Sequence, residues 1–543
     1  AMRRLLLFPC ATALVAALAL VRFVEGVPLT QGVRGRKGMH SNQELLPAIH
    51  LSDLDSVGLR HFVDAHGRQR ILHGVNAVVK GPPWHPSVDG FDVDTSLCDH
   101  DFAILQEAGV TVIRLGVMWP GVEPERGQYN TTYIDIMRGI AENAAKFGIY
   151  TLLDMHQDVM SEKFCGEGIP LWAVKPSGSF HFPEPVTYAY SLDPSTGLPR
   201  RQDCKKKAWS DYYFSEATGT AFQALYDNHD GLLDAWAAMW AKVTASFKGS
   251  SHILGVELIN EPWAGDVVHN PTLLVPTKAD KQNLQHCYDQ LAKAVWDADP
   301  DRLVFFSGVT WADYGNGFSA APAGVAARSV LSYHYYEFPA GPQVKGSSWA
   351  WVSLQVEEAR RLGTGAMLTE FGEPDGPFSP GAFAQTTGAA EAAGHSWACW
   401  EYKTFCTPPS PSSSAQNSSW GACKTGYGGA MWDKNGGVVE RAYRQLGRPY
   451  ATAVAGELQA AVFDETANTL SLRYLPAANA SAPTVIRAPL ALRYPHGFSV
   501  AISPPAAATW TQHDPSTLLV SHADTPLPAV IVVTLSPQSP SLA

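Results

Sequence analysis

Two apolar segments of the sequence each end in a glutamate. The run 253–259 leads within two residues to Glu261, and Pro262 after it cannot continue the hydrogen-bond ladder of a strand. A second apolar run, 366–369, ends directly at Glu370. Two carboxyl groups delivered by the ends of buried strands suit the acid–base and nucleophilic steps that cleave a glycosidic bond. The pair predicts a two-carboxylate hydrolase.

Polar and aromatic side chains also follow the other apolar segments. They are Lys80, Arg114, Asp154, His156, Asp158, Asn260, His334, Tyr336 and Trp400. Each of them alone could be structural, because a buried histidine can bond to a carbonyl, a tryptophan can fill a core and an arginine can pair with a carboxylate. Carboxylates are seldom buried unless they have a partner or a function, so a functional role is favoured more strongly for Glu261 and Glu370 than for the other residues. Their common position predicts one shared site.

Eight apolar segments have the length and composition of buried strands. They span residues 71–76, 112–115, 150–154, 253–259, 303–306, 330–334, 366–369 and 396–400. Amphipathic helical patterns occupy residues 101–108, 133–147, 231–247, 281–297, 349–362, 380–393 and 440–446. This alternation is typical of an α/β protein, a (β/α)8 TIM barrel with its site at the strand C-termini. An open doubly wound sheet is the alternative, but no glycine-rich phosphate loop follows the first strand.

The pattern changes after residue 450. Short alternating stretches at 470–474, 490–494 and 529–535 are punctuated by Pro, Asn and Asp. We therefore expect a catalytic barrel over residues 55–450 and an antiparallel β-sandwich domain over 451–543. Long insertions at 160–218 and 404–429 are candidates for the walls of a cleft.

The N-terminal residues have the layout of a secretory signal peptide. Arg3 and Arg4 precede the apolar run 5–20, and small residues follow near Gly26. We expect a signal peptide over 1–26 and an N-terminal extension over 27–54. An uncleaved anchor is the alternative, although the apolar run is short for a spanning helix. The protein is then expected to be secreted, to the extracellular space or a lysosome-like compartment.

Secretion would allow disulfides among the eight cysteines. Cys10 leaves with the signal peptide, and seven remain, so at least one should be free. Cys406 and Cys423 flank a loop rich in Pro and Ser and are the first candidate pair; Cys165 with Cys204 is the second. No pair has zinc-ligand spacing, and we expect no metal or cofactor. N-glycosylation sequons begin at Asn130, Asn417 and Asn479.

Composition excludes some partners. A net charge of −11 argues against nucleic acid, and the run 205–207 of three lysines is too short to be more than a solvated loop. Hydrophobic residues make up 45% and charged residues 17% of the chain, as in globular proteins. Sixteen tryptophans supply core packing and also flat faces that can stack on sugars. We expect a monomer.

Several of these residues together resemble glycoside hydrolase family 5, a family of retaining (β/α)8 enzymes. They are Arg114, His156, Asn260-Glu261-Pro262, His334-Tyr335-Tyr336, Glu370 and Trp400. More narrowly, Gly74-Val75-Asn76 with Lys80, the run 153–158 and the run 258–265 are similar to endoglycoceramidases and their glycosylceramidase relatives, which also carry a C-terminal β-sandwich. The resemblance implies that Glu261 is the acid/base and Glu370 the nucleophile.

The chemistry sets further expectations for these residues. Retention needs the two carboxyl groups roughly 5–5.5 Å apart. Arg114 and Tyr336 should hold Glu370 charged, so that Glu261 is the easier of the two to protonate. Asn260 is placed to bind the sugar 2-OH, and Trp400 should form the floor under the sugar. Lys80 and Asp158 would bind outer hydroxyls. The loop residues Phe164, Ile169, Leu171 and Trp172 are expected to line a groove for lipid chains.

Three functions remain open at this point. The first is hydrolysis of the linkage between glycan and ceramide in glycosphingolipids, at membrane or micelle surfaces. The second is another hydrolase: a glucosylceramidase acting on single-sugar ceramides, or a β-1,4-glucanase or mannanase acting on polysaccharides. The third is a non-catalytic glycolipid-binding protein, which the two intact glutamates disfavour.

Overall fold

The computed structural model describes residues 46–310, 315–336, 347–372, 380–405, 431–433, 437–522, 527 and 529–538. These residues fall in one compact unit, residues 45–543. Among them, no helix has both the length and the apolar character needed to cross a bilayer.

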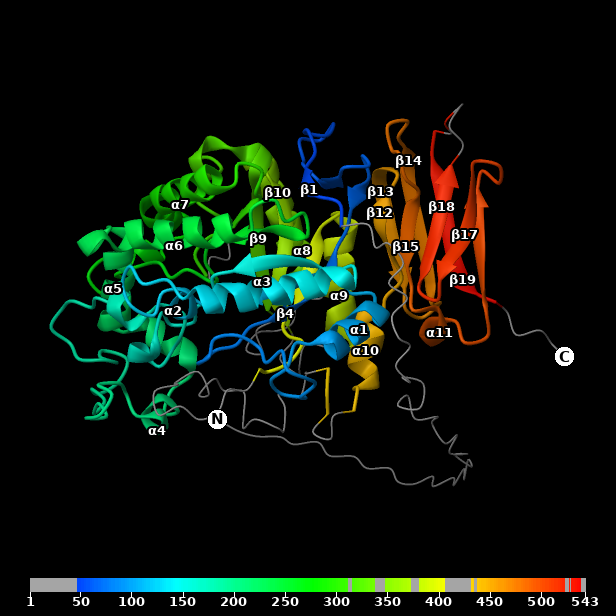
Figure 1. Ribbon diagram of the computed structural model, residues 1–543. Coiled ribbons are helices and arrows are strands. Elements are labelled where there is room, and N and C mark those ends of the chain that lie inside the picture. Colours follow the sequence, from blue (N-terminus) through cyan, green and yellow to red (C-terminus); the bar gives the residue numbers. More distant parts are fainter. Residues whose placement is uncertain are drawn as a thin grey trace, which may run out of the picture. The chain divides into compact units, whose positions relative to one another are not determined.

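Eight parallel strands close into a barrel (Figure 1). In chain order they are β4 (His73–Ala77), β5 (Val112–Gly116), β6 (Tyr150–Asp154), β7 (Ile253–Glu257), β8 (Val304–Phe306), β9 (Ser329–Tyr336), β10 (Gly365–Gly372) and β11 (Ser396–Cys399). β11 pairs with β4 and completes the ring. Nearly every strand residue is buried, as expected for strands covered on both faces. Each predicted strand segment overlaps one of these strands, so the (β/α)8 barrel is confirmed.

Helices follow the strands and cover them (Figure 1). They are α1 (Asp99–Glu107), α2 (Trp119–Val122), α3 (Thr131–Lys146), α4 (Arg201–Cys204), α5 (Glu216–Tyr226), α6 (Leu232–Ser246), α7 (Gln285–Ala298), α8 (Ser347–Leu362), α9 (Pro380–Ala392) and α10 (Glu440–Leu446). Short 3-10 turns are η2 (Glu162–Phe164), η3 (Leu171–Ala173), η4 (Trp209–Phe214), η5 (His229–Gly231), η6 (Pro271–Leu274), η8 (Pro322–Gly324) and η9 (Ala326–Arg328), and the π-helical turn η7 (Asp280–Leu284) leads into α7. α3 illustrates how the sequence favours a helix. The Asn130 side chain caps its first turn by accepting a hydrogen bond from the Tyr133 amide, and one face of the helix is buried.

Two antiparallel sheets form the rest of the described unit. One has the order β1-β2-β3-β12-β15-β18-β17 and the other β13-β14-β19-β16. Their strands are β1 (Ile49–Leu51), β2 (Phe62–Asp64), β3 (Gln69–Arg70), β12 (Tyr450–Val454), β13 (Gly456–Asp464), β14 (Thr469–Pro476), β15 (Thr484–Arg487), β16 (Phe498–Ser503), β17 (Ala508–Asp514), β18 (Thr517–His522) and β19 (Ile531–Pro537). Residues of both sheets share one hydrophobic cluster, which includes Ile486 and Val520 of the first and Leu472 and Val533 of the second. The predicted C-terminal antiparallel β domain is confirmed.

Two features of this domain differ from what the sequence predicted. The strands β1–β3 precede the barrel in the chain, yet β3 pairs with β12 and so adds them to the C-terminal domain's sheet. The sequence analysis did not predict this long-range pairing. The stretch 490–494 is not a strand, and that prediction was wrong: it contains the one-turn helix α11 (Leu490–Arg493). An alternation of five residues is too short to separate a strand from a helical turn.

One of the two predicted disulfides lies within the described residues. Cys165 and Cys204 are bonded, with 5.5 Å between their Cα atoms, which confirms that pair. The bond ties the loop after β6 to α4. Cys406 and Cys423 lie outside the described residues. Three further cysteines, Cys98, Cys287 and Cys399, are buried and free, in agreement with the expectation of at least one free thiol.

Candidate active site

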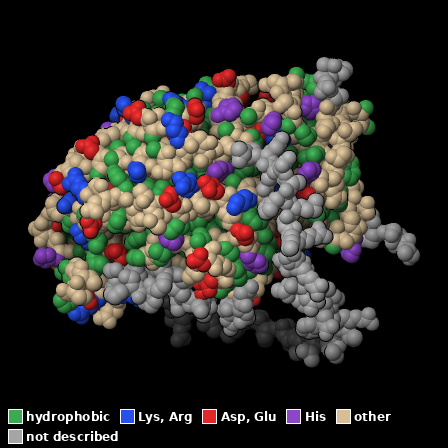
Figure 2. Space-filling model, viewed as in Figure 1, with side chains coloured by type: hydrophobic (Ala, Val, Ile, Leu, Met, Phe, Trp, Pro, Cys, Tyr) green, Lys and Arg blue, Asp and Glu red, His purple; other side chains and the backbone are tan. Residues whose placement is uncertain are grey.

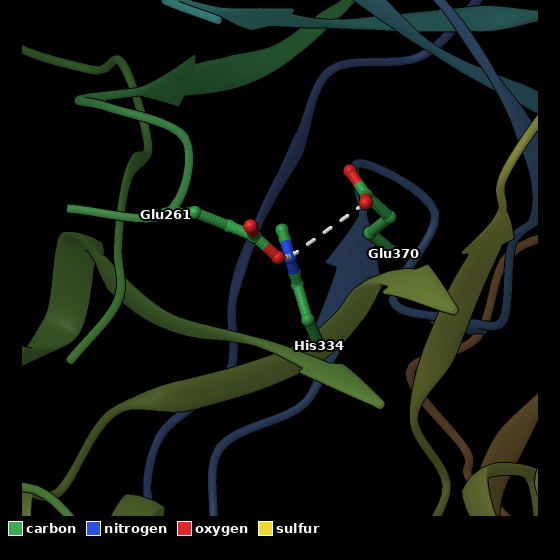
Figure 3. A group of neighbouring side chains, drawn as sticks. All are labelled: Glu261, His334 and Glu370. Atoms are coloured by element: carbon green, nitrogen blue, oxygen red, sulfur yellow. Dashed lines mark hydrogen bonds and ion pairs between the residues drawn. The ribbon is translucent and has the colours of Figure 1, made fainter. Parts of the chain in front are cut away.

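Glu261 and Glu370 lie at the same end of the barrel, with His334 between them (Figure 3). Glu370 is on β10, and Glu261 follows the end of β7. One carboxylate oxygen of each glutamate lies within 4.8 Å of the other. This spacing fits a pair that works by a covalent intermediate, because an inverting pair must stand roughly 6.5–9.5 Å apart to admit a water.

The carboxylate of Glu370 is held by two donors. Arg114 Nη1 donates to its Oε2 at 3.0 Å, and the Tyr336 hydroxyl donates to its Oε1 at 2.7 Å. These are the two partners that the sequence analysis expected. Because each oxygen accepts one bond, the orientation of the carboxylate is fixed before any substrate arrives.

Arg114 is the centre of a buried network beneath the two glutamates. Its guanidinium donates to Glu257 Oε2 at 2.6 Å, to Asn76 Oδ1 at 2.8 Å and to Asn260 Oδ1 at 2.9 Å, and it lies 3.1 Å from Asp154 Oδ1. Burial opposes its charge, but the three neighbouring carboxylates raise the pKa of Arg114 further above its ordinary value. Glu257 was not among the site residues predicted from the sequence. A charged residue inside an apolar strand was the available signal, since such a residue needs a partner.

The turn that carries Glu261 has an unusual backbone. Glu261 has φ of 41°, in the left-handed region that non-glycine residues seldom adopt. The Gln157 side chain stabilises this turn, because its Nε2 donates to the carbonyls of both Asn260 and Glu261 at 2.8 Å. Asn260 Nδ2 donates in return to the Gln157 carbonyl at 2.9 Å. The sequence analysis did not predict this positioning role of Gln157.

His334 connects the two glutamates. Its Nδ1 lies 2.9 Å from Glu261 Oε1 and 4.0 Å from Glu370 Oε1. Burial lowers the pKa of His334, but Glu370 and the hydrogen bond to Glu261 outweigh burial and raise it above the ordinary value. The indole of Trp351 donates to the His334 carbonyl at 2.8 Å and fixes its strand. The three side chains offer ligand atoms close enough for a metal ion, but the same contacts serve two-carboxylate hydrolysis, which requires none.

His156 and Trp400 form one wall of the site. The two rings stack with centroids 5.3 Å apart and an interplanar angle of 15°. His156 Nδ1 lies 2.8 Å from Asp154 Oδ2. Burial opposes protonation, yet Asp154 raises the pKa of His156 to about 9, so the ring is an imidazolium at neutral pH. A charged ring against the indole face gives Trp400 a fixed position.

A second group of charges surrounds Lys80. Its ammonium pairs with Asp158, lies 3.4 Å from Glu167 Oε1 and stands over the Trp400 ring at 4.7 Å. Burial, the largest cause in both cases, raises the pKa of Glu167 and the pKa of Glu401 to about 8. Burial thus favours the neutral form of both carboxyl groups, a form that can donate as well as accept a hydrogen bond.

The sequence analysis identified neither Glu167 nor Glu401. Glu401 directly follows Trp400, so its place after a strand was a usable signal. Glu167 lies in a long insertion, where nothing in the sequence marks it. It reaches the site because its backbone pairs with Asp158, with N–O distances of 2.8 and 3.1 Å.

The prediction that Phe164, Ile169, Leu171 and Trp172 line a lipid groove is wrong for most of these residues. Phe164 and Ile169 are each only 2% exposed and belong to the main core, and Phe164 packs on Phe182. Trp172 packs on Trp119 and donates from its indole to the Glu123 carbonyl. Leu171 alone is well exposed, at 40%. Two of the four residues are in the core, one is partly buried and one is exposed, which a short apolar loop sequence does not reveal.

Exposed apolar surface instead lies beside the segment that follows Glu261. Phe214, at the end of η4, is 47% exposed, and its ring contacts the buried ring of Trp263 edge-on at 5.0 Å. Trp263 is two residues beyond Glu261 and also stacks on Tyr213. The contact with Trp263 connects the exposed ring of Phe214 to the segment that follows Glu261.

Comparisons with known proteins agree with this arrangement. Residues 89–405 match the family model "Cellulase (glycosyl hydrolase family 5)", and residues 448–534 match the "Glycoside hydrolase family 5 C-terminal domain". An endoglycoceramidase of Cyanea nozakii is 40% identical over 85% of this chain and 89% of its own length. An endoglycoceramidase of Hydra vulgaris is also 40% identical, over 83% of this chain and 83% of its own length. Endo-glycoceramidase II from Rhodococcus sp., solved as a lactosyl-enzyme intermediate, has the same fold, with a TM-score of 0.67 at 22% identity over 88% of this chain and 99% of that one.

Proposed function

Because this chain belongs to glycoside hydrolase family 5 and is a retaining glycosidase, we propose that it hydrolyses the bond between the glycan and the ceramide of glycosphingolipids. The observation that carries the substrate class is the 40% identity to two endoglycoceramidases over most of both chains. The paired glutamates supply the chemistry, and the groups around them supply sites for a sugar and for a lipid.

The reaction proceeds in two displacements. In the first, Glu370 attacks the anomeric carbon while Glu261 gives its proton to the ceramide oxygen, so the glycosidic bond breaks and a glycosyl ester forms. In the second, Glu261 takes a proton from water, the water oxygen attacks the anomeric carbon, and the ester bond to Glu370 breaks. Two inversions return the sugar in its original β configuration.

The buried groups near Trp400 are placed to bind the glycan. Asn260 lies next to Glu261 and can reach the 2-OH of the sugar under attack, a contact that strengthens in the transition state. Lys80 with Asp158 can hold outer hydroxyls. Glu167 and Glu401 add two carboxyl groups, whose pKa values burial raises, to this set. A site built from such polar groups rejects ligands that lack the matching hydroxyls.

The leaving group lies on the Glu261 side, because that residue protonates the leaving oxygen. The exposed ring of Phe214 is therefore placed to contact the ceramide. Burying part of an aromatic side chain against a lipid stabilises the complex by about 1–2 kcal/mol. Ceramide should bind better than a short alkyl chain for this reason.

We predict that lactosylceramide in mild detergent is cleaved faster than cellotetraose or a short-chain alkyl lactoside at matched concentration. The Phe214→Ala variant should lose about tenfold in kcat/KM on lactosylceramide and little on an aryl lactoside, since only the ceramide reaches that ring. Val462→Ala, which removes an exposed apolar side chain from β13, is the matched control. Faster cleavage of cellotetraose would instead identify a polysaccharide hydrolase, and cleavage of glucosylceramide alone a glucosylceramidase.

We further propose that the enzyme works outside the cytosol as a monomer. The signal-like segment with Arg3 and Arg4 supports export, and the Cys165–Cys204 disulfide fits an oxidising compartment. Secretion would bring the enzyme to lipids on an extracellular or lumenal membrane face.

A further inference from the structure

The insertion after β6 carries a dense group of cations that the reaction does not use. Residues 200–207 contain two arginines and three lysines against one aspartate, in a chain whose net charge is −11. All five cationic residues are exposed. Arg200, Arg201 and Lys205, with Gln202, line an open hollow of about 460 Å³. Over most of the face shown in Figure 2, acidic and basic side chains are interspersed.

Apolar and aromatic side chains lie among these cations. The Lys206 ammonium donates to the Tyr188 hydroxyl at 3.1 Å and stands over the rings of Tyr188 and Tyr190 at 5.4 and 5.6 Å. Tyr188 is 64% exposed and Leu192 is 51% exposed. Leu192 forms a β-bridge with Pro199, which brings it beside the first arginine. We call Tyr188, Leu192 and the five cationic residues of 200–207 the basic aromatic patch.

A disulfide ties the patch to the loop that carries Glu167. Cys204 of α4 is bonded to Cys165, and two residues further on Glu167 reaches Lys80 at 3.4 Å. The Tyr212 hydroxyl donates to the Cys204 carbonyl at 2.9 Å and holds α4 from the other side. Because the insertion follows β6, whose C-terminal end bears His156, the patch belongs to the end of the barrel where the two glutamates lie.

We propose that the basic aromatic patch docks the enzyme on a bilayer that carries anionic lipid, with the barrel end that bears the two glutamates directed toward the membrane. Cations near such a surface are attracted to its headgroups, and tyrosine and leucine side chains enter the boundary between headgroups and acyl chains. This inference rests on the proposed function, since an enzyme acting on membrane-bound glycolipid must work at a lipid surface. It goes beyond the expectation that lysines 205–207 form only a solvated loop, because in the fold Arg200, Arg201 and Tyr188 lie beside them.

The test is sedimentation with vesicles that contain no glycosphingolipid. The enzyme should bind vesicles of phosphatidylcholine with about one-fifth phosphatidylserine, and binding should fall strongly between low salt and about 0.5 M salt. The triple variant Arg200→Gln, Lys205→Gln and Lys207→Gln should bind roughly fivefold more weakly per cation removed, about 100-fold in all. It keeps the Lys206–Asp203 ion pair and the disulfide.

A matched control removes three exposed lysines elsewhere, by Lys248→Gln, Lys281→Gln and Lys293→Gln, with the same change of net charge. The proposal expects the control to bind like the wild type, and both triple variants to cleave a soluble aryl lactoside at the wild-type rate. Three results would overturn the proposal. They are binding to pure phosphatidylcholine vesicles that equals binding to vesicles with phosphatidylserine, a loss of binding that is equal in the two triple variants, and binding only when a ganglioside is present. Because the vesicles hold no substrate, failure of the proposed function would leave this result unaffected.

Discussion

Replacing Glu370 with glutamine is expected to reduce turnover of every substrate by several orders of magnitude while the fold is retained. The amide cannot form the glycosyl ester, so both displacements are lost. Glu261→Gln should reduce kcat/KM on lactosylceramide by about 10²–10⁴-fold, because the ceramide oxygen then leaves without a proton. Circular dichroism and thermal melting should show folded protein in both cases, since each glutamine keeps the size of the side chain it replaces.

The two variants should differ on a substrate with a good leaving group. A dinitrophenyl lactoside needs no protonation of its leaving oxygen, so its first step should be largely restored in Glu261→Gln and should remain blocked in Glu370→Gln. Pre-steady-state release of dinitrophenol measures that step. Glu142→Gln, at an exposed glutamate on α3, is the control and should behave as the wild type. Equal rescue of both active-site variants would overturn the assignment of the two roles.

Replacing Arg114 with glutamine should affect both stability and activity. The change leaves the buried carboxylates of Asp154, Glu257 and Glu370 without their shared cation. Removing one partner of a buried ion pair usually costs about 3–5 kcal/mol. The Glu370 carboxylate would also lose one of its two donors, so residual activity should fall even at temperatures where the variant is folded.

Denaturation in urea, followed by tryptophan fluorescence, measures this effect. Arg126→Gln is the control, because Arg126 forms a largely exposed ion pair with Asp230 and should cost at most about 1 kcal/mol. Arg114→Lys keeps the charge but cannot make the forked contacts, so its stability should lie between those of Arg114→Gln and the wild type. If Arg114→Gln unfolded at the wild-type midpoint, the network would not have the central role described here.

The barrel was predictable because its strands are mostly apolar and are separated by amphipathic helices. The two glutamates and most of their partners were predictable for a related reason: in a parallel barrel, residues at the ends of different strands meet at one rim. Glu370, Arg114 and Tyr336 come from three separate strands, yet they lie within hydrogen-bond distance.

The parts that were not predicted depend on loops and on pairing between distant residues. Glu167 enters the site through an insertion whose course is set by a disulfide and a backbone pairing, and neither leaves a periodic pattern in the sequence. Phe164 and Ile169 were placed on the surface because a loop has no period that tells buried from exposed positions. The β3–β12 pairing joins segments almost four hundred residues apart, and local propensity cannot indicate it.

The central claim is that the enzyme releases the intact glycan from ceramide with retention. Proton NMR of the sugar formed in the first minutes from lactosylceramide tests both parts at once. We predict that β-lactose appears first and that the α-anomer follows only by mutarotation. Initial formation of α-lactose would mean inversion and would remove the nucleophilic role of Glu370. Initial release of galactose would mean attack at the outer sugar and would contradict cleavage at the ceramide linkage.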